Sequence, residues 1–252
     1  MDARPLDGQV ALVTGGSRGL GKEFARALAA AGATVAVLSP HLDACQRAVD
    51  ELVESGAIAM ATAADVTRRD ELKRAAEEVT RELGPVDVLV NNAGIGIKRD
   101  SLDVTEEEWR NVFAVNVDGV WNCSQIFGAG MVARGRGSIV NIGSMSGFIV
   151  NRPQNQAAYN ASKAAVHHLT RSLAAEWAPF GVRVNALAPG YVKTDMSPVD
   201  RPDLQRWWVE DAPMRRYAEV SEFGPAVVFL ASDASSFMTG EVLVMDGGYS
   251  LF

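Results

Sequence analysis

The chain has 252 residues, a formal net charge of −7, and 48% hydrophobic and 22% charged residues. These proportions are typical of a globular protein with a sizeable core. The acidic balance argues against a nucleic-acid partner, which would need a basic surface for phosphates. No apolar run reaches the ~18 residues that span a bilayer, so we expect no membrane partner.

The two cysteines, Cys45 and Cys123, lie far apart in the sequence, and no Cys/His cluster is present. We therefore expect neither a metal site nor a disulfide framework. Few thiols and the lack of a signal-peptide pattern predict a cytoplasmic protein.

Short apolar runs alternate with helical periodicities along the chain. We expect strands at 9–14, 34–38, 57–61, 86–90, 137–142, 182–187 and 241–245. We expect helices at 22–31, 41–55, 68–83, 105–131, 157–178 and 221–232, with an irregular segment at 198–216. This order predicts an α/β fold, a Rossmann-type doubly wound parallel sheet of about seven strands with helices on both faces. We expect one domain over 1–252, with a cofactor half at about 8–135 and a catalytic and substrate half at about 136–252.

A glycine-rich stretch, Gly15-Gly-Ser-Arg-Gly-Leu-Gly21, follows the first predicted strand and opens a helix. Glycines at this place let the backbone turn sharply and approach a pyrophosphate at the helix N-terminus. The spacing is not that of the G-x-G-x-x-G fingerprint or of a P-loop. A tight strand-to-helix turn without a ligand is the alternative interpretation.

Tyr159 and Lys163 stand four residues apart in a predicted helix. One turn of helix places both side chains on the same face. A free phenol has a pKa near ~10, and a nearby ammonium favours the phenolate and lowers that pKa. The pair is therefore a candidate for proton transfer, although Tyr159 is also compatible with an ordinary half-buried phenol.

These motifs, together with Asn91-Asn-Ala-Gly94, Ser144 and Asp246-Gly-Gly248, resemble the short-chain dehydrogenase/reductase family in content and order. The resemblance covers essentially the whole chain. It implies a nicotinamide cofactor, a small-molecule substrate and a homotetramer or homodimer. It also implies these cofactor-binding residues: Gly15, Ser17, Arg18, Gly19, Leu20, Ser39, Asp65, Val66, Asn91, Ala93, Gly94, Tyr159, Lys163, Pro189, Gly190, Val192 and Thr194.

The end of the second predicted strand bears on the choice between NAD and NADP. An acidic residue there bonds the ribose 2′-hydroxyl of NAD, whereas a nearby Arg accommodates the 2′-phosphate of NADP. The chain has Ser39-Pro40 at this place, and Arg18 lies beside Gly19. We therefore favour NADP, with NAD left open.

The resemblance implies catalytic roles for Asn116, Ser144, Tyr159 and Lys163. Tyr159 would act as the acid/base, Lys163 would lower its pKa, and Ser144 would polarise the substrate oxygen. Asn116 would bend its helix and hold a water in the proton relay. Ser144 could instead belong to a plain loop, and Asn116 could be a mid-helix Asn with a structural water.

The segment before Tyr159 resembles that of the polyol dehydrogenases and ketose reductases of the family. Its amides suit a substrate with several hydroxyls, since unpaired buried polar groups reject an apolar analogue. The candidate substrate-binding residues are Ser146, Asn151, Gln154, Gln156 and Tyr191. Alternatively, the amides bond only the backbone of their own loop or a neighbouring subunit. A 3-oxoacyl thioester reductase and a non-catalytic NAD(P)-sensing protein remain alternative functions.

The roles of a histidine pair and of a tryptophan pair are not decided by the motifs above. His167 and His168 follow Lys163 on the same helix, and we expect packing or a subunit contact from them rather than chemistry. Trp207-Trp208 lies where the family places a substrate-covering segment. The Trp pair is expected either to close over the substrate or to join the core.

Overall fold

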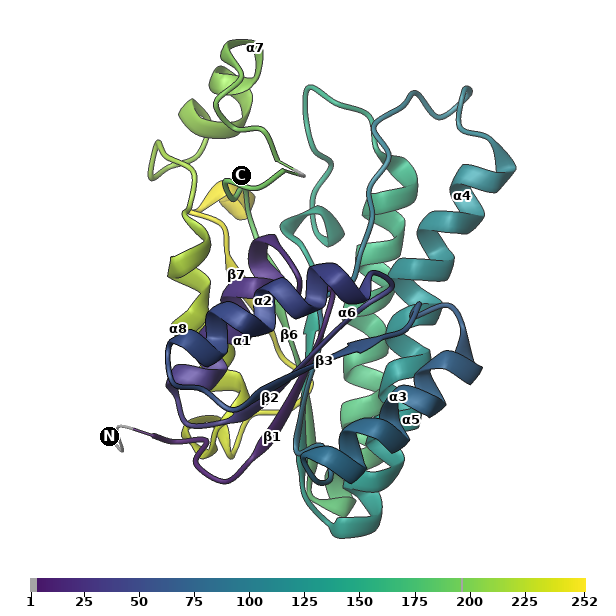
Figure 1. Cartoon of the computed structure of the whole chain (residues 1–252). Coiled ribbons are helices and arrows are strands. Elements are labelled where there is room, and N and C mark those ends of the chain that lie inside the picture. Colours follow the sequence, from purple (N-terminus) through teal and green to yellow (C-terminus); the bar gives the residue numbers. More distant parts are fainter. Residues whose placement is uncertain (1–3, 196) are drawn as a thin grey trace.

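The computed structural model describes residues 4–195 and 197–252. Its centre is one sheet of seven parallel strands in the order β3-β2-β1-β4-β5-β6-β7 (Figure 1). The strands are β1 (Val10–Thr14), β2 (Thr34–Ser39), β3 (Ala59–Ala63), β4 (Val88–Asn91), β5 (Gly137–Ile142), β6 (Val182–Pro189) and β7 (Val242–Met245). The strand order reverses at β1 and β4, so the carboxyl ends of these strands border the crevice where ligands bind in this architecture. The predicted doubly wound sheet is confirmed.

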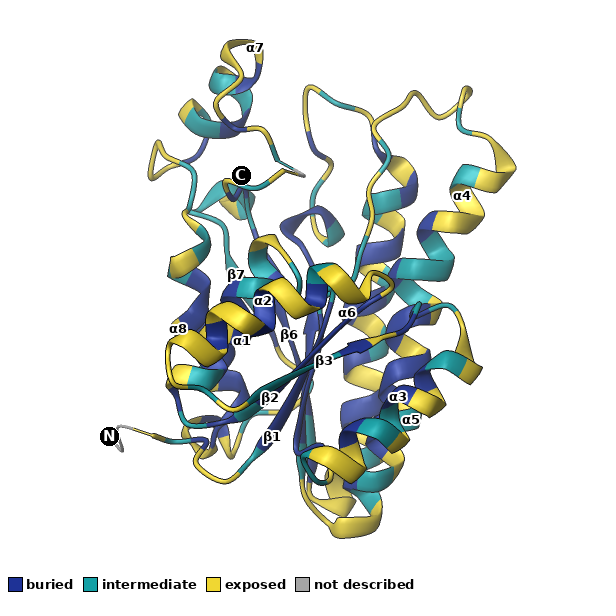
Figure 2. Cartoon of the chain, in the orientation of Figure 1, coloured by how far each residue is buried: buried dark blue, intermediate teal, exposed yellow. Residues whose placement is uncertain are grey.

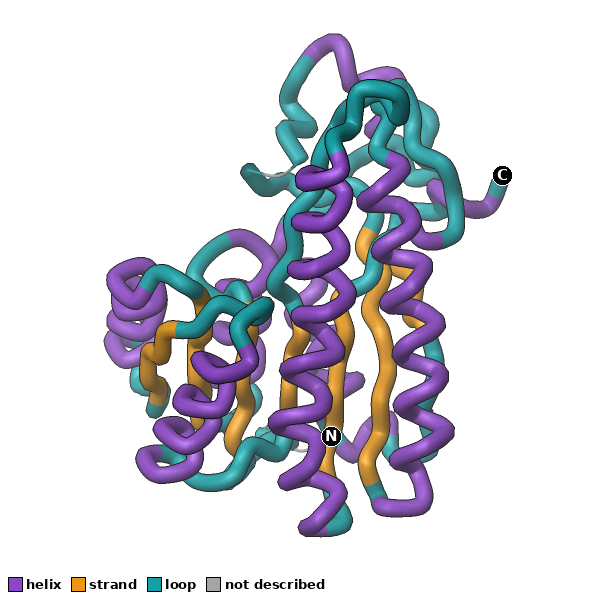
Figure 3. The backbone as a smooth tube through the Cα atoms, turned by 90° about the vertical axis from the view of Figure 1, so that its right-hand side faces the viewer, coloured by secondary structure: helices purple, strands orange, loops and turns teal. Residues whose placement is uncertain are grey.

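Helices cover both faces of the sheet, as Figures 1 and 3 show. One face carries α1 (Gly19–Ala30), α2 (Leu42–Glu54) and α8 (Gly224–Ala231). The other carries α3 (Arg69–Glu82), α5 (Gly119–Arg134) and α6 (Ala157–Trp177), with α4 (Glu106–Phe113) beside α6. The strands are largely buried on both faces, as their near-continuous apolar sequences require (Figure 2).

A third, smaller apolar cluster lies apart from the two layers that flank the sheet. Its buried members are Met145, Tyr191, Val199, Leu204 and Trp208. They come from the short 3₁₀ turn at Met145–Gly147, the end of β6, and the segment that contains α7 (Pro202–Gln205). In Figure 1 this segment stands above the carboxyl ends of the strands. The cluster therefore forms a wall over the sheet edge where ligands bind.

The helix predicted at 105–131 is interrupted, which corrects the prediction of one continuous helix. Thr105 and Glu108 form the expected capping box at the start of α4. A π-helical turn at Ala114–Asp118 then separates α4 from α5. Asn116, the residue expected to bend its helix, lies in this turn. A π turn holds one residue more than α-helical hydrogen bonding closes, and such turns are frequent at functional sites.

Other boundaries differ by a few residues. The first helix begins at Gly19 rather than 22, because the glycine-rich turn supplies its first turn. The third strand runs from Ala59 to Ala63, since it pairs in register with all but the first residue of β2. The segment 198–216, predicted to be irregular, contains α7 and a π turn at Arg206–Glu210. The helix expected at 221–232 starts with a 3₁₀ turn at Val220–Phe223.

Candidate active site

The glycine-rich turn joins β1 to α1. Gly15 and Gly19 have φ angles of 62° and 54°, which glycine adopts without strain. A Cβ on Gly21 would overlap the carbonyl oxygen of Gly15, so only glycine lets strand and helix approach this closely. Within the described residues, no side chain caps α1 at Arg18, and the first turn contains no acidic residue. The N–H groups at this helix end are therefore free to bind an anion such as a pyrophosphate.

The segment after β6 borders this turn from the other side. Gly190 donates its N–H to the carbonyl of Met245 over 2.9 Å, and a Cβ on Gly190 would lie 2.6 Å from the Cα of Asp246. Val192 is buried. The methyl group of Thr194 lies 3.8 Å from the place of a Cβ on Gly19. Of the remaining residues predicted around the turn, Ser17 and Leu20 are partly exposed, and Pro189 ends β6.

The two adjacent asparagines after β4 have different structural roles. Asn92, which was not among the predicted site residues, donates from Nδ2 to the carbonyls of Thr14 and Gly15 over 3.0 and 3.1 Å. It therefore fixes the glycine-rich turn. Asn91 is buried and donates from Nδ2 to Ser124 and Asn141 in the core. The side chain of Asn91 is thus directed into the protein, although the sequence suggested a cofactor contact.

Ala93 and Gly94 continue this strand end toward the catalytic residues. The N–H of Ala93 donates to Thr14 Oγ1 over 3.0 Å. A Cβ on Gly94 would lie 3.3 Å from Asn116 Oδ1 and 3.6 Å from Lys163 Nζ. The absence of a side chain at Gly94 therefore leaves the space beside the lysine open.

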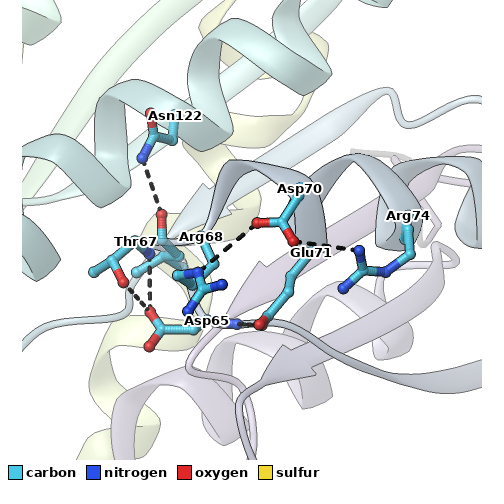
Figure 4. Close-up of polar contacts among 8 residues, drawn as sticks. Asp65, Thr67, Arg68, Asp70, Glu71, Arg74 and Asn122 are labelled. Atoms are coloured by element: carbon cyan, nitrogen blue, oxygen red, sulfur yellow. Dashed lines mark hydrogen bonds and ion pairs between the residues drawn. The ribbon is translucent and has the colours of Figure 1, made fainter.

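Asp65 stabilises its own turn after β3. Its Oδ1 accepts from the N–H and the hydroxyl of Thr67 over 2.9 and 2.8 Å (Figure 4). Its N–H donates to Glu71, and the carbonyl of the buried Val66 accepts from Asn122. Figure 4 shows this group between α3, which carries Glu71, and α5, which carries Asn122. The predicted contact of Asp65 and Val66 with adenine stays a prediction.

The two residues used to choose between NAD and NADP point in opposite directions. Ser39 is buried, and its hydroxyl lies 3.0 Å from Cys45 Sγ and 3.3 Å from the carbonyl of His41. Its side chain is therefore turned inward. Arg18 is largely exposed and forms an ion pair of 3.3 Å with the equally exposed Asp195. The Arg18 guanidinium thus lies on the exposed side of the glycine-rich turn, paired with the Asp195 carboxylate from the segment after β6.

Ser144 and Tyr159 face the same cavity, from the end of β5 and from α6. The Ser144 hydroxyl donates to Ser146 Oγ over 3.0 Å and accepts from the Ser146 N–H over 3.1 Å. One face of the Tyr159 ring lies against Gly96, whose Cβ would be 3.3 Å from Cδ2 of the ring. The sequence did not single out Gly96, and nothing in its pattern signals this contact.

Lys163 is buried one helical turn after Tyr159, with its Nζ 5.6 Å from the centre of the phenol ring. The ammonium donates to the carbonyl of Ile142 over 2.7 Å. Asn116 Oδ1 accepts from the N–H of Ile95, while its Nδ2 donates to the carbonyl of Ile95 and to Ser162 over 2.9 Å each. The side chain of Asn116 thus holds the Ile95 loop, the π turn and α6 together.

Burial dominates the acid–base properties of the pair. It raises the pKa of Tyr159, and a hydrogen bond from Ser144 acts in the opposite direction. It lowers the pKa of Lys163 to about 8. The net shift of the Tyr159 pKa in the protein alone is therefore upward, opposite to the lowering expected from Lys163, because desolvation of the phenolate outweighs the hydrogen bond from Ser144.

The cavity beside this pair measures about 380 Å³. All five predicted substrate-binding residues line it: Ser146, Asn151, Gln154, Gln156 and Tyr191. The Tyr191 hydroxyl accepts from Asn151 Nδ2 and Gln154 Nε2 over 3.2 and 3.3 Å. Gln156 Nε2 donates to Asn151 Oδ1 and to Asn160 Oδ1 over 3.0 and 2.9 Å. The amides therefore bond one another and Tyr191, rather than the backbone of their own loop as the alternative interpretation expected.

Trp208 closes this network and resolves the question left by the tryptophan pair. It is buried, stacks on Tyr191 with 4.5 Å between ring centres, and donates from Nε1 to Gln154 Oε1 over 3.0 Å. Lys98, which was not predicted, also lines the cavity, and its Nζ lies over the Trp208 ring, 4.5 Å from the ring centre. Trp208 thus both belongs to the third apolar cluster and lines the cavity, whereas Trp207 is only partly buried.

Comparisons with known proteins agree with this geometry. A family model described as enoyl-(acyl carrier protein) reductase matches residues 15–250. The chain is 51% identical over 249 residues to a galactitol 2-dehydrogenase (L-tagatose-forming) of Cereibacter sphaeroides, covering 98% of this chain and 97% of the relative. A solved short-chain type dehydrogenase/reductase of Mycobacterium marinum is 41% identical with a TM-score of 0.95, covering 99% of this chain and 98% of the other. A gluconate 5-dehydrogenase of Burkholderia cenocepacia, solved with NADP and tartrate, is 35% identical with a TM-score of 0.95, covering 100% and 98%.

The chain belongs to the short-chain dehydrogenase/reductase family. It is an oxidoreductase that uses a nicotinamide cofactor. The uncapped N-terminus of α1, beside glycines where a Cβ would not fit, suits the phosphates of such a cofactor. In the described part of the chain, no group of three His, Cys, Asp or Glu side chains is arranged to hold a metal ion, and no helix is both long and apolar enough to cross a bilayer.

Proposed function

We propose that this enzyme transfers hydride between the nicotinamide and a secondary alcohol or ketone of a polyol or sugar. The observation that carries the proposal is the cavity in which Tyr159 and Ser144 meet a wall of amides. The identity to a galactitol dehydrogenase supports the substrate class. An apolar acyl chain suits this wall less well, because the buried amides would lose hydrogen-bonding partners.

In the proposed mechanism, Tyr159 exchanges the proton of the substrate oxygen and Ser144 donates a hydrogen bond to that oxygen. The nicotinamide, when bound, supplies or accepts the hydride. Since burial raises the pKa of Tyr159, the phenol is held protonated and is ready to serve as the acid for ketone reduction. For alcohol oxidation, the Lys163 ammonium stabilises the phenolate electrostatically, which is the role of a fixed charge near developing charge.

We assign Asn116 to the support of this pair. Its contacts with Ile95 and Ser162 join the loop above the phenol to the helix that carries Tyr159 and Lys163. The bond from Lys163 to the Ile142 carbonyl holds the ammonium at the end of β5. These contacts fix the two residues that flank the phenol, so the relative positions of Tyr159 and Lys163 are held from both sides.

The cavity residues Asn151, Gln154 and Gln156 would then bind the remaining substrate hydroxyls. Each amide presents both donors and acceptors, so one wall can serve hydroxyls of different orientation. The direct amide–amide bonds seen here are the interactions that substrate hydroxyls would exchange for their own.

The substrate class is tested by following cofactor absorbance with a panel of polyols, ketoses and 3-oxoacyl esters. Turnover confined to oxoacyl esters would support a thioester reductase instead, and tight cofactor binding without any turnover would support a sensor. Tyr159→Phe should lose about 10³-fold in turnover while it still binds cofactor, because it removes the acid/base and little else. Tyr217→Phe, whose hydroxyl contacts the exposed Asp200 and Lys193 outside the catalytic pair, is the matched control.

We further propose NADP as the favoured cofactor. Support comes from the exposed Arg18 at the turn, from Ser39 in place of an acid at the end of β2, and from NADP in the solved gluconate 5-dehydrogenase. Michaelis constants for both cofactors test this choice, and a preference of tenfold or more for NAD would overturn it.

A homotetramer or homodimer in the cytoplasm completes the proposal. Trp109 on α4 is 42% exposed, Trp121 on α5 is 40% exposed, and Phe252 is fully exposed. Large apolar side chains on one pair of helices are typical of a subunit contact. Two buried free thiols, Cys45 and Cys123, fit a reducing compartment.

A further inference from the structure

His167 lies directly behind Ser144 and is packed inside the protein, as one of its two expected roles required. It is 3% exposed on α6, one turn after Lys163, and its ring packs on Phe148 with 4.4 Å between ring centres. A Cβ on Gly143 would overlap its Nε2, and a Cβ on Gly147 would lie 2.5 Å from its Cε1. The turn that carries the catalytic serine therefore has two glycines where the imidazole needs space.

One polar contact links the imidazole to the site. The main-chain N–H of Ser144 donates to His167 Nε2 over 3.4 Å. A nitrogen that accepts a hydrogen bond carries no proton, so the proton of the neutral ring is on Nδ1. Nδ1 is buried without a partner among the described residues. Burial and the charges of Lys163 and Arg171 hold the pKa of His167 down at about 4, so the ring stays neutral.

We propose that His167 is a positioning residue: its neutral imidazole holds the main chain of Ser144 so that the Ser144 hydroxyl faces the substrate oxygen. The imidazole does not line the cavity, so it acts through Ser144 rather than on the substrate. Ser144 caps the 3₁₀ turn at Met145–Gly147 with the same hydroxyl, so a shift of its backbone moves that hydroxyl. The inference rests on the proposed function of Ser144 but not on the identity of the substrate.

The variants His167→Gln and His167→Leu separate positioning from packing. Gln places an acceptor oxygen as many bonds from the backbone as Nε2, whereas Leu fills space without an acceptor. We expect His167→Leu to lose up to about 10²-fold in kcat, the scale of a small misplacement at an active site. His167→Gln should recover most of this loss, and cofactor Kd should stay unchanged in both. His168→Leu, on the exposed neighbour, is the matched control.

Two results would overturn the proposal: wild-type kcat in His167→Leu, or equal losses in the Gln and Leu variants in step with their Tm. The pH profile adds a second measurement. As the pH falls to about 4, the wild-type ring gains a proton and can no longer accept, so kcat should fall there, while His167→Gln lacks this acid limb. The charged groups that face the ring are Lys163 and Arg171 of α6. The turn at 143–148 has no ionisable side chain of its own, and apart from His167 itself the titratable partner of Ser144 is the phenol of Tyr159.

A readout independent of turnover keeps this inference apart from the proposed function. In the 15N NMR spectrum of histidine-labelled protein at neutral pH, His167, assigned with His167→Gln, should show the tautomer protonated at Nδ1. The tautomer protonated at Nε2 would contradict the proposal even in an active enzyme. Failure of the polyol panel with this tautomer present would instead count against the substrate class alone.

Discussion

The two sides of the active site are built in different ways. The cofactor side consists of backbone: glycines at 15, 19 and 21, a free helix end, and Asn92 bonded to main-chain carbonyls. The substrate side consists of side chains, in which amides and aromatic rings bond one another within a small separate cluster. A backbone cradle accepts few substitutions and one kind of ligand group. A side-chain wall, by contrast, can be altered residue by residue, so we expect it to carry the substrate specificity.

Breaking the backbone side should have the largest effect. Gly21→Ala places a methyl group against the carbonyl of Gly15 and pushes the turn away from α1. Overpacking of this kind costs about 1–3 kcal/mol, so cofactor Kd should rise by up to about a hundredfold. Titration of tryptophan fluorescence with cofactor measures it. Gly130→Ala, in the middle of α5 beside only the flexible end of Arg134, is the control and should leave Kd unchanged.

Breaking the side-chain side should have a smaller effect that is confined to the substrate. Tyr191→Phe keeps the stack on Trp208 but removes the acceptor of Asn151 and Gln154. An unpaired buried polar group costs about 1–3 kcal/mol, so we expect KM for the polyol to rise about tenfold. Cofactor Kd should not change. A parallel rise in cofactor Kd would show that the two sides are not independent.

The smallest effect is expected at the rim of the cofactor side. Arg18→Ala removes an exposed cation, and exposed charge pairs contribute under ~1 kcal/mol, so the Michaelis constant for NADP should rise only about fivefold. The constant for NAD should stay the same. Lys22→Ala, which removes another exposed cation of α1, serves as the control. Equal effects of Arg18→Ala on both cofactors would argue against a contact with the 2′-phosphate.

The same contrast explains how far the sequence could predict the molecule. The glycine-rich turn and the Tyr159–Lys163 pair follow from local geometry, since helix spacing and positive φ angles are properties of short segments. The sheet was predictable because buried parallel strands are short apolar runs. The substrate candidates were found as polar residues in one stretch, but their bonding to Tyr191 and Trp208 required the fold, because these partners are about 40 and 50 residues distant.

The directions of side chains at strand ends could not be predicted from the sequence. Ser39 ends β2 and Asn91 ends β4, on either side of β1, and alternation along a strand does not tell whether the last side chain faces the ligand or the core. The contact between His167 and Ser144 could not be predicted, because it is made by a main-chain N–H, which leaves no trace in the pattern of side chains. The pKa of Tyr159 was misjudged because the depth of burial is a property of the packed protein.

The π turn at Ala114–Asp118 has a consequence for how variants of this region should be interpreted. Asn116 lies within the turn and bonds both the Ile95 loop and Ser162 of α6. A substitution that removes its amide therefore disturbs a loop and two helices at once. Loss of activity in such a variant would report the support of the site as well as its chemistry.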